Sequence, residues 1–192
     1  MRIFAIRHLM TQWNKLKLLQ GRSDQSILYP DEEELLILKE NVKQIKEHGP
    51  FDKVLTSSLK RTFETAFLYG YDSAKVNKEP LLDELDFGKK LEGESREGIT
   101  DIWETALKKE QDLIFGESME RFASRVKQFI EKYKEYKTLL VFGHGVWLRA
   151  LISLSRHGDL NHLAEVNLKN NQLFICDVNI EAFSSAVLEN ER

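Results

Sequence analysis

Short apolar runs alternate with amphipathic stretches along most of this chain. Residues 1–7, 53–56 and 138–142 are apolar runs bounded by polar or turn-forming residues, a pattern typical of buried strands. Residues 173–178 form a further candidate strand, and the segment 75–98 combines a short strand with an irregular, glycine-containing stretch. Strands that alternate with helices predict an α/β fold with a largely parallel sheet covered on both faces.

Several of the other segments have apolar residues three and four positions apart, as on one face of a helix. Asp31 and Glu34 form the pattern of a capping box and predict a helix start, and Gly49-Pro50 predicts its end. Ser118 predicts the start of a longer helix with an apolar stripe from Met119 to Tyr133. Further helices are expected at about residues 59–69, 99–109 and 146–154 and near the end of the chain.

Length and composition are those of one globular unit. The chain has 192 residues, 42% hydrophobic and 31% charged, without repeats or linker-like tracts, so we expect a single domain over residues 1–192. Its 28 basic and 31 acidic side chains give a net charge of −3, which does not favour nucleic acid or a membrane surface as partner. An anion site would therefore be a local cluster of basic residues.

Cys176 is the only cysteine, so neither an internal disulfide nor a thiolate metal site is expected. The sequence shows no secretory leader and no apolar run of membrane-spanning length. A cytoplasmic location is the simplest expectation.

Two histidines directly follow predicted strands. Arg7-His8 ends the first strand, and Gly143-His144-Gly145 follows the strand at 138–142. Ligands of open α/β sheets bind beyond the carboxyl ends of the strands, so these two ends predict one pocket. An arginine beside a possible histidine nucleophile suits phosphate chemistry, because guanidinium donors match phosphate oxygens.

Two further segments add related groups. Arg61 lies in the first turn of a predicted helix, where the helix dipole disfavours a cation unless an anion binds nearby. Asp83, Glu84 and Asp86 alternate with apolar residues, and one partly buried carboxylate among them could act as a general acid. Each segment alone is also compatible with solvated side chains.

Taken together, these segments resemble the histidine phosphatase superfamily, also called the phosphoglycerate mutase-like family, over roughly residues 1–177. Several motifs in order are far more specific than any one of them. In chain order, the motifs are Arg7-His8-Leu9-Met10-Thr11 with Asn14, Gln20-Gly21-Arg22-Ser23-Asp24, Ser57-Ser58-Leu59-Lys60-Arg61-Thr62 with Thr65-Ala66, Leu82-Asp83-Glu84-Leu85-Asp86-Phe87-Gly88, Gly116-Glu117-Ser118 with Arg125, and Gly143-His144-Gly145-Val146.

The resemblance implies a three-layer α/β/α sandwich around a mostly parallel sheet, and chemistry without a metal or other cofactor. It implies that His8 is the nucleophile and forms a phosphohistidine, with a neutral ring whose Nδ1–H is held by an acceptor such as a backbone carbonyl. Arg7, Arg61 and His144 would surround the phosphoryl group. Glu84 would protonate the leaving oxygen.

Other site residues follow from the same motifs and loops. Asp83 and Asp86 are the fallback candidates for the acid. Substrate-binding candidates are Thr11, Asn14, Gln20, Gly21, Arg22 and Gly145. Candidates for substrate selection are Leu9, Arg22, Ser23, Lys60, Lys89, Lys90 and Trp147. We interpret His48, His157 and His162, which lie outside the motifs, as surface or structural residues.

Two departures from the family pattern bear on the substrate. Leu9 stands where the family usually has glycine, and it would be strained at positive φ or would otherwise narrow the pocket. Val146 and Trp147 replace a common glycine and a smaller apolar residue. Leu9 and Trp147 therefore hint at an apolar or flat leaving group.

The choice of reaction depends on anion-binding capacity. Mutases of this family carry a longer insertion with additional arginines, whereas the span between Phe87 and Gly116 is short here and Arg96 is its only arginine. Little capacity for a second anion favours hydrolysis of a small-molecule phosphomonoester. Phosphoglycerate mutase-type transfer is the alternative, and a non-catalytic binding or regulatory domain is a third hypothesis.

Overall fold

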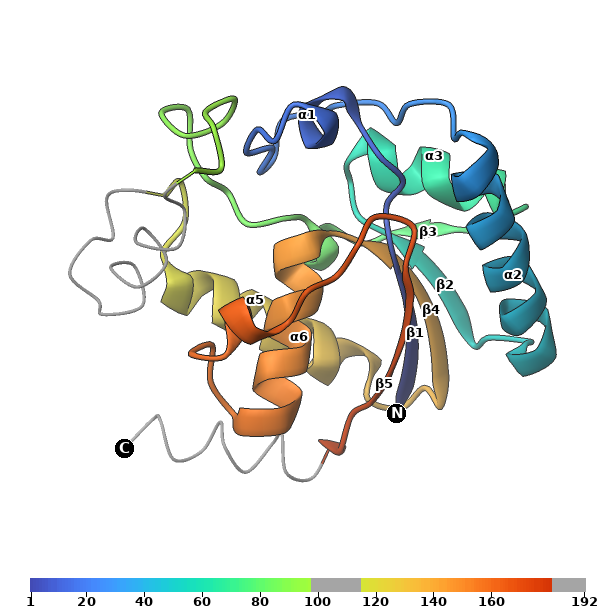
Figure 1. Cartoon of the computed structure of the whole chain (residues 1–192). Helices are drawn as coiled ribbons and strands as arrows, with labels where there is room; N and C mark the ends of the chain where they lie inside the picture. Colours follow the sequence, from blue (N-terminus) through green and yellow to red (C-terminus); the bar gives the residue numbers. More distant parts are fainter. Residues whose placement is uncertain (98–114, 181–192) are drawn as a thin grey trace.

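A computed structural model describes residues 1–97 and 115–180 (Figure 1). A five-stranded sheet with the order β3-β2-β4-β1-β5 runs through its middle. All neighbouring strands are parallel except the pair β1–β5, which confirms the predicted, largely parallel sheet. The strands are β1 (Arg2–Arg7), β2 (Lys53–Thr56), β3 (Asn77–Lys78), β4 (Thr138–Gly143) and β5 (Leu173–Asp177).

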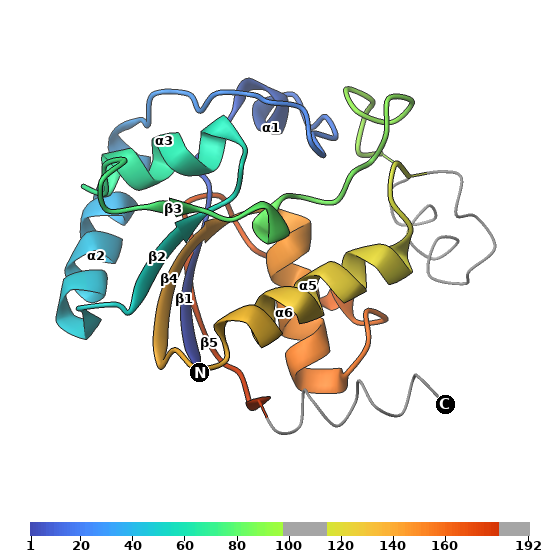
Figure 2. The same ribbon diagram turned by 180° about the vertical axis from the view of Figure 1, so that it is seen from behind.

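Helices cover both faces of the sheet (Figures 1 and 2). α2 (Glu32–His48) and α3 (Lys60–Leu68) lie on one face, and α5 (Met119–Tyr133) and α6 (Gly145–His157) lie on the other. The expected three-layer α/β/α fold is thus confirmed. No helix within residues 1–97 and 115–180 is long and apolar enough to span a bilayer. Shorter elements are α1 (Gln12–Lys15) and the 3-10 turns η1 (Pro80–Leu82) and η2 (Leu163–Glu165).

Helix ends follow local chain signals. Asp31 caps α2 in the predicted capping box with Glu34, and Ser118 caps α5. α6 continues beyond the expected end at residue 154 and stops where Gly158 adopts a φ of 81°. α1 is a single turn in the segment after β1, and it is too short to show periodicity in the sequence. The helix predicted at 99–109 and the C-terminal helical pattern lie outside the described residues.

Alternation along the central strands builds two separate cores. In β1, Ile3 and Ala5 join the cluster formed with α5 and α6, whereas Phe4 and Ile6 join the cluster formed with α2 and α3. The apolar stripe predicted for α5 is buried in the first cluster. Burial on both faces explains why these strands are continuously apolar in sequence.

The pairing of β1 with β4 sets the position of the candidate chemistry. The two strands are parallel, and Arg7 lies opposite Gly143 in the ladder. The residues that follow, His8 and His144, therefore leave the sheet side by side, with ring centroids 5.4 Å apart. The sequence predicts this proximity of the residues that follow the two strands.

Leu9 and Trp147 do not shape a substrate pocket, so the structure removes the reason for expecting an apolar or flat leaving group. Leu9 is fully buried in the core against α2 and α3, and it is not among the non-glycine residues with positive φ in the described ranges. Trp147 is fully buried in the opposite core, where its Nε1 donates to the Leu81 carbonyl at 2.7 Å. Both side chains stabilise the fold.

Truncation of Leu9 should therefore destabilise the protein. We expect Leu9→Ala to lower the free energy of unfolding by about 2–5 kcal/mol, the usual cost of a cavity at a buried leucine. Leu36→Ala is the matched control, since Leu36 is 66% exposed, and should change stability by less than about 0.5 kcal/mol. Urea unfolding of the three proteins measures both values, and equal stabilities would contradict the assignment of Leu9 to the core.

Candidate active site

A cavity of about 180 Å³ opens at the carboxyl edge of the central strands. We call it the arginine cavity, because four arginines are among its walls. Its lining residues are Arg7, His8, Asn14, Leu19, Gln20, Gly21, Arg61, Glu84, Phe87, Arg96, Gly145, Val146 and Arg149.

His8 is buried at the end of β1 and has a defined tautomer. Its Nδ1 lies 2.7 Å from the Leu9 carbonyl oxygen, which can only accept, so Nδ1 carries the proton and Nε2 the lone pair. Burial, followed by the charges of Arg61 and Arg7, holds the pKa of His8 well below its usual range. The ring is therefore neutral near pH 7, as a nitrogen nucleophile requires.

Arg7 lies beside His8, packed against the start of α6. Its Nη1 donates to the Leu168 carbonyl at 2.5 Å. Gly145 allows this approach, because a Cβ at that position would lie 3.2 Å from the Arg7 Cζ. Burial lowers the pKa of Arg7 to about 10, so the side chain keeps its charge near pH 7.

Arg61 is fully buried in the first turn of α3. Its Nη1 and Nη2 donate to the carbonyls of Ser23 and Gly21, each at 2.7 Å. Its Nε donates to His144 Nδ1 at 3.2 Å. These bonds use three of the five guanidinium N–H groups. Burial lowers the pKa of Arg61 to about 10, which leaves it a fixed cation near pH 7.

His144 lies behind this group and is not among the residues that line the arginine cavity. Because Nδ1 accepts from Arg61, Nε2 carries the proton and donates to Ser57 Oγ at 2.7 Å. Burial, followed by the charge of Arg61, lowers the pKa of His144 well below its usual range. In this geometry His144 orients Arg61 and packs against the His8 ring.

Of the three acidic candidates, Glu84 is the one that lines the cavity. Its carboxylate accepts from the backbone N–H groups of Val146 at 3.0 Å and Trp147 at 2.9 Å, at the start of α6. Asp83 instead accepts from Ser58 N at 2.7 Å, and Asp86 accepts from Gly88 N at 2.8 Å. The extended segment thus directs one carboxylate into the cavity and two towards backbone elsewhere.

Arg125 and Glu117 hold that acidic segment in place. Arg125 Nη1 donates to the carbonyl oxygens of Leu81 at 3.0 Å and Asp83 at 2.5 Å. Arg125 Nη2 pairs with Glu117 Oε1 at 2.7 Å, and the same oxygen accepts from Asp86 N at 3.0 Å. The motif around residues 116–125 therefore supports the segment that presents the acid.

The predicted substrate-binding residues divide into two groups. Asn14, Gln20, Gly21 and Gly145 line the cavity. Thr11 is buried as the N-cap of α1, and Arg22 is exposed, so neither belongs to the lining. The other loop residues predicted to select the substrate are also absent from the lining; these are Ser23, Lys60, Lys89 and Lys90.

Sequence reasoning missed two cationic residues of the cavity, Arg96 and Arg149. Arg149 lies four residues after Gly145 and three after Val146, so these three share one face of α6, and that spacing was a usable signal. Arg96 lies after an irregular stretch whose path the sequence pattern did not predict. The cavity therefore holds two more cationic side chains than the sequence analysis assigned to it.

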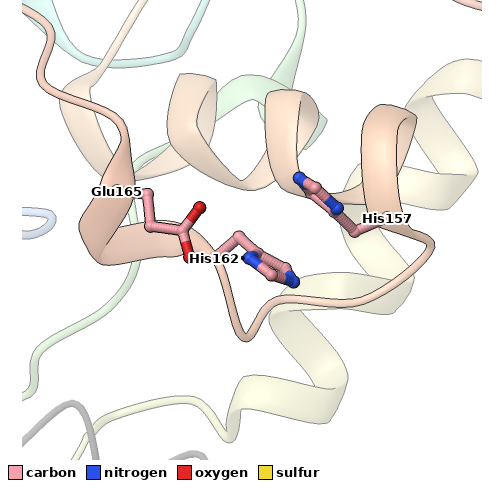
Figure 3. A group of neighbouring side chains, drawn as sticks. All are labelled: His157, His162 and Glu165. Atoms are coloured by element: carbon pink, nitrogen blue, oxygen red, sulfur yellow. Dashed lines mark hydrogen bonds and ion pairs between the residues drawn. The ribbon is translucent and has the colours of Figure 1, made fainter.

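The histidines outside the motifs do not line the cavity. His48 packs on Phe4, with ring centroids 5.0 Å apart. His157, the last residue of α6, stacks on His162 with ring centroids 3.8 Å apart, and His162 Nδ1 lies 2.8 Å from Glu165 Oε1 (Figure 3). The ligand atoms of this trio lie within 4.8 Å of one another.

The two buried neutral histidines should make stability depend on pH. An unfolded chain binds protons on His8 and His144 below about pH 6.5, whereas the folded protein resists them. Above about pH 6.5 these two histidines leave the free energy of unfolding independent of pH. As the pH falls below that value, the free energy of unfolding decreases by up to about 1.4 kcal/mol per pH unit for each histidine. Urea unfolding between about pH 5.5 and 7.5 should show a shallower slope for His8→Gln and for His144→Gln than for the wild type. Identical slopes would contradict burial of neutral rings.

Comparisons with known proteins find relatives that match most of this chain. The chain is 29% identical over 164 residues to a Serratia proteamaculans protein named "Probable phosphoglycerate mutase GpmB", covering 80% of this chain and 74% of that protein. It is 27% identical over 180 residues to "Putative phosphoserine phosphatase 2" of Hydrogenobacter thermophilus, covering 88% and 85%.

A solved structure extends the similarity to the fold. The alpha-ribazole phosphatase of Shigella flexneri has a TM-score of 0.74 and 25% identity, over 94% of this chain and 92% of that one. The family model for branch 1 of the histidine phosphatase superfamily matches residues 3–191. The chain therefore belongs to the histidine phosphatase superfamily.

Proposed function

We propose that this protein is a phosphatase that hydrolyses a small-molecule phosphomonoester through a phosphohistidine on His8. The observation that carries the proposal is the pairing of a neutral His8, with its Nε2 lone pair free, and two fixed cations in one cavity. Loose phosphoryl transfer needs mainly position and positive charge, and Arg7 and Arg61 supply both. The names of the relatives, which include phosphatases of small phosphate esters, support the same reaction class.

The first half-reaction moves the phosphoryl group to the protein. His8 Nε2 donates its lone pair to phosphorus, and the bond between phosphorus and the ester oxygen breaks. Glu84 gives its proton to the departing oxygen, so the product leaves as an alcohol. Arg7 and Arg61 stabilise charge on the non-bridging oxygens, and His144 holds Arg61 in position.

The second half-reaction releases phosphate. A water molecule attacks the phosphorus of phosphohistidine while Glu84 takes up its proton, and the bond to Nε2 breaks. The hydrogen bond from Nδ1–H to the Leu9 carbonyl keeps the ring in the same tautomer through both steps. Asn14 and the Gly145 backbone, both at the cavity wall, are positioned to contact phosphate oxygens.

Mutase-type transfer is the alternative, because several relatives are named as mutases. In that reaction the phosphoryl group on His8 passes to a hydroxyl group instead of water. A hydrolysis assay with chelator, run beside a phosphoglycerate mutase assay, separates the two. We expect free phosphate to exceed isomerised product, and the opposite ratio would favour the mutase.

His8→Ala tests the nucleophile. We expect loss of hydrolysis by at least about a thousandfold, together with loss of the acid-labile phosphate that the wild-type protein retains after exposure to substrate. His48→Ala is the matched control, since His48 is an exposed histidine outside the cavity. Unchanged hydrolysis by the His8→Ala protein would overturn the mechanism.

Glu84→Gln tests the acid. The amide keeps an oxygen acceptor for α6 but has no proton to transfer to the leaving oxygen. We expect kcat for alkyl phosphates to fall about 10²–10⁴-fold, and to fall much less for p-nitrophenyl phosphate, whose leaving group departs as a stable anion. Asp83→Asn, which conserves the contact to Ser58, is the control. Equal losses on both substrate types would assign the acid role elsewhere.

A further inference from the structure

We propose that Arg96 and Arg149 form a second anion-binding subsite, and that the preferred substrate is a compact phosphomonoester with a carboxylate or a second phosphate on its leaving group. The inference rests on the proposed phosphatase function, because it places the second group relative to His8 and Glu84.

The charge balance of the arginine cavity is the first argument. Four arginines, namely Arg7, Arg61, Arg96 and Arg149, face one carboxylate, Glu84, among the described lining residues. A phosphoryl dianion offsets two of these positive charges. When Glu84 carries the proton that it donates, the remaining two have no partner within the lining. A second anionic group on the substrate would balance them.

The bonding of the two additional arginines is the second argument. Within the described residues, neither Arg96 nor Arg149 makes an ion pair, and Arg149 Nε is buried without a hydrogen-bond acceptor. Arg96 Nε donates to the Leu18 carbonyl at 3.1 Å, which orients its guanidinium. Arg125, outside the cavity, differs from these two arginines, because its guanidinium forms an ion pair with Glu117 at 2.7 Å. A half-buried arginine without a carboxylate has donors available for a ligand.

The position of the subsite is the third argument. Val146 N holds the Glu84 carboxylate at 3.0 Å, and Arg149 lies one helical turn further along the same face of α6. Glu84, Arg96 and Arg149 all line the arginine cavity, so the three side chains border one space of about 180 Å³. Glu84 protonates the leaving oxygen in the proposed mechanism. A leaving group that extends past Glu84 would therefore meet Arg149 and Arg96.

The size of the cavity limits the substrate. Its volume of about 180 Å³ is smaller than the roughly 300–1,000 Å³ of pockets for drug-sized ligands. A short carbon skeleton with two anionic ends fits this space and charge better than a flat aromatic leaving group.

Equilibrium binding to His8→Ala protein tests the subsite without turnover. Calorimetry would compare O-phosphoserine with O-phosphoethanolamine, which differ by a carboxylate, and 1,3-propanediol bisphosphate with its monophosphate. We expect the doubly anionic member of a pair to bind about 10- to 100-fold more tightly, as for a charge-assisted hydrogen bond. The first pair reports a carboxylate and the second a phosphate, so a preference confined to one pair identifies the group.

Variants in the same His8→Ala background identify the residues. Arg149→Met and Arg96→Met should each reduce the affinity ratio to within about threefold of unity, and Arg149→Lys should retain part of it. Arg156→Met is the matched control, because Arg156 is exposed on the same helix outside the cavity, and it should preserve the ratio. Far-ultraviolet circular dichroism confirms that the variants fold.

The outcomes separate this inference from the proposed function. Ratios near unity in the His8→Ala protein, or ratios that survive both methionine variants, would overturn the second subsite even if the wild type hydrolyses phosphomonoesters. Absence of hydrolysis by the wild type, with a ratio that depends on Arg96 and Arg149, would overturn the phosphatase function and retain the subsite.

Discussion

The parallel pairing of β1 with β4 is the constraint on which the candidate site depends. Arg7 lies opposite Gly143, so the chain leaves both strands at the same level and the same edge. A shift of the register by one residue would turn each side chain to the other face and separate the His8 and His144 rings. The register itself is held by apolar side chains that pack in two cores, one on each face of the sheet. The packing of these cores thus positions the polar groups that follow the two strands.

Buried charge in this site is solvated by neutral groups. Arg7 donates to the Leu168 carbonyl, and Arg61 donates to the carbonyls of Gly21 and Ser23. Carbonyl oxygens satisfy guanidinium donors without cancelling their charge, so the positive potential remains available to a ligand. The same potential, with burial, keeps His8 neutral. One arrangement thereby provides both the electrostatic stabilisation and the nucleophile, before any substrate arrives.

Sequence motifs predicted the reacting groups better than their surroundings. Arg7, His8 and Arg61 line the cavity as expected, because they lie at a strand end and a helix start, whose place at the edge of the sheet follows from the fold. Glu84 was expected there from its motif alone, since its segment is irregular. Leu9 was misjudged for a different reason. A side chain beside a nucleophile can point to either face, and the sequence does not say that this one enters the core against α2 and α3.

The sequence by itself determined the alternation of strands and helices, the capping of α2 by Asp31, and the identity of the groups at the strand ends, since these depend on local pattern and chain geometry. Tertiary structure alone decided which charges share the cavity. Arg96 and Arg149 are 53 positions apart in the printed sequence, and the folded chain brings both to the lining of one cavity. Contacts between distant segments leave no periodic pattern in the sequence. The two arginines of the proposed second subsite could therefore be recognised together only in the tertiary structure.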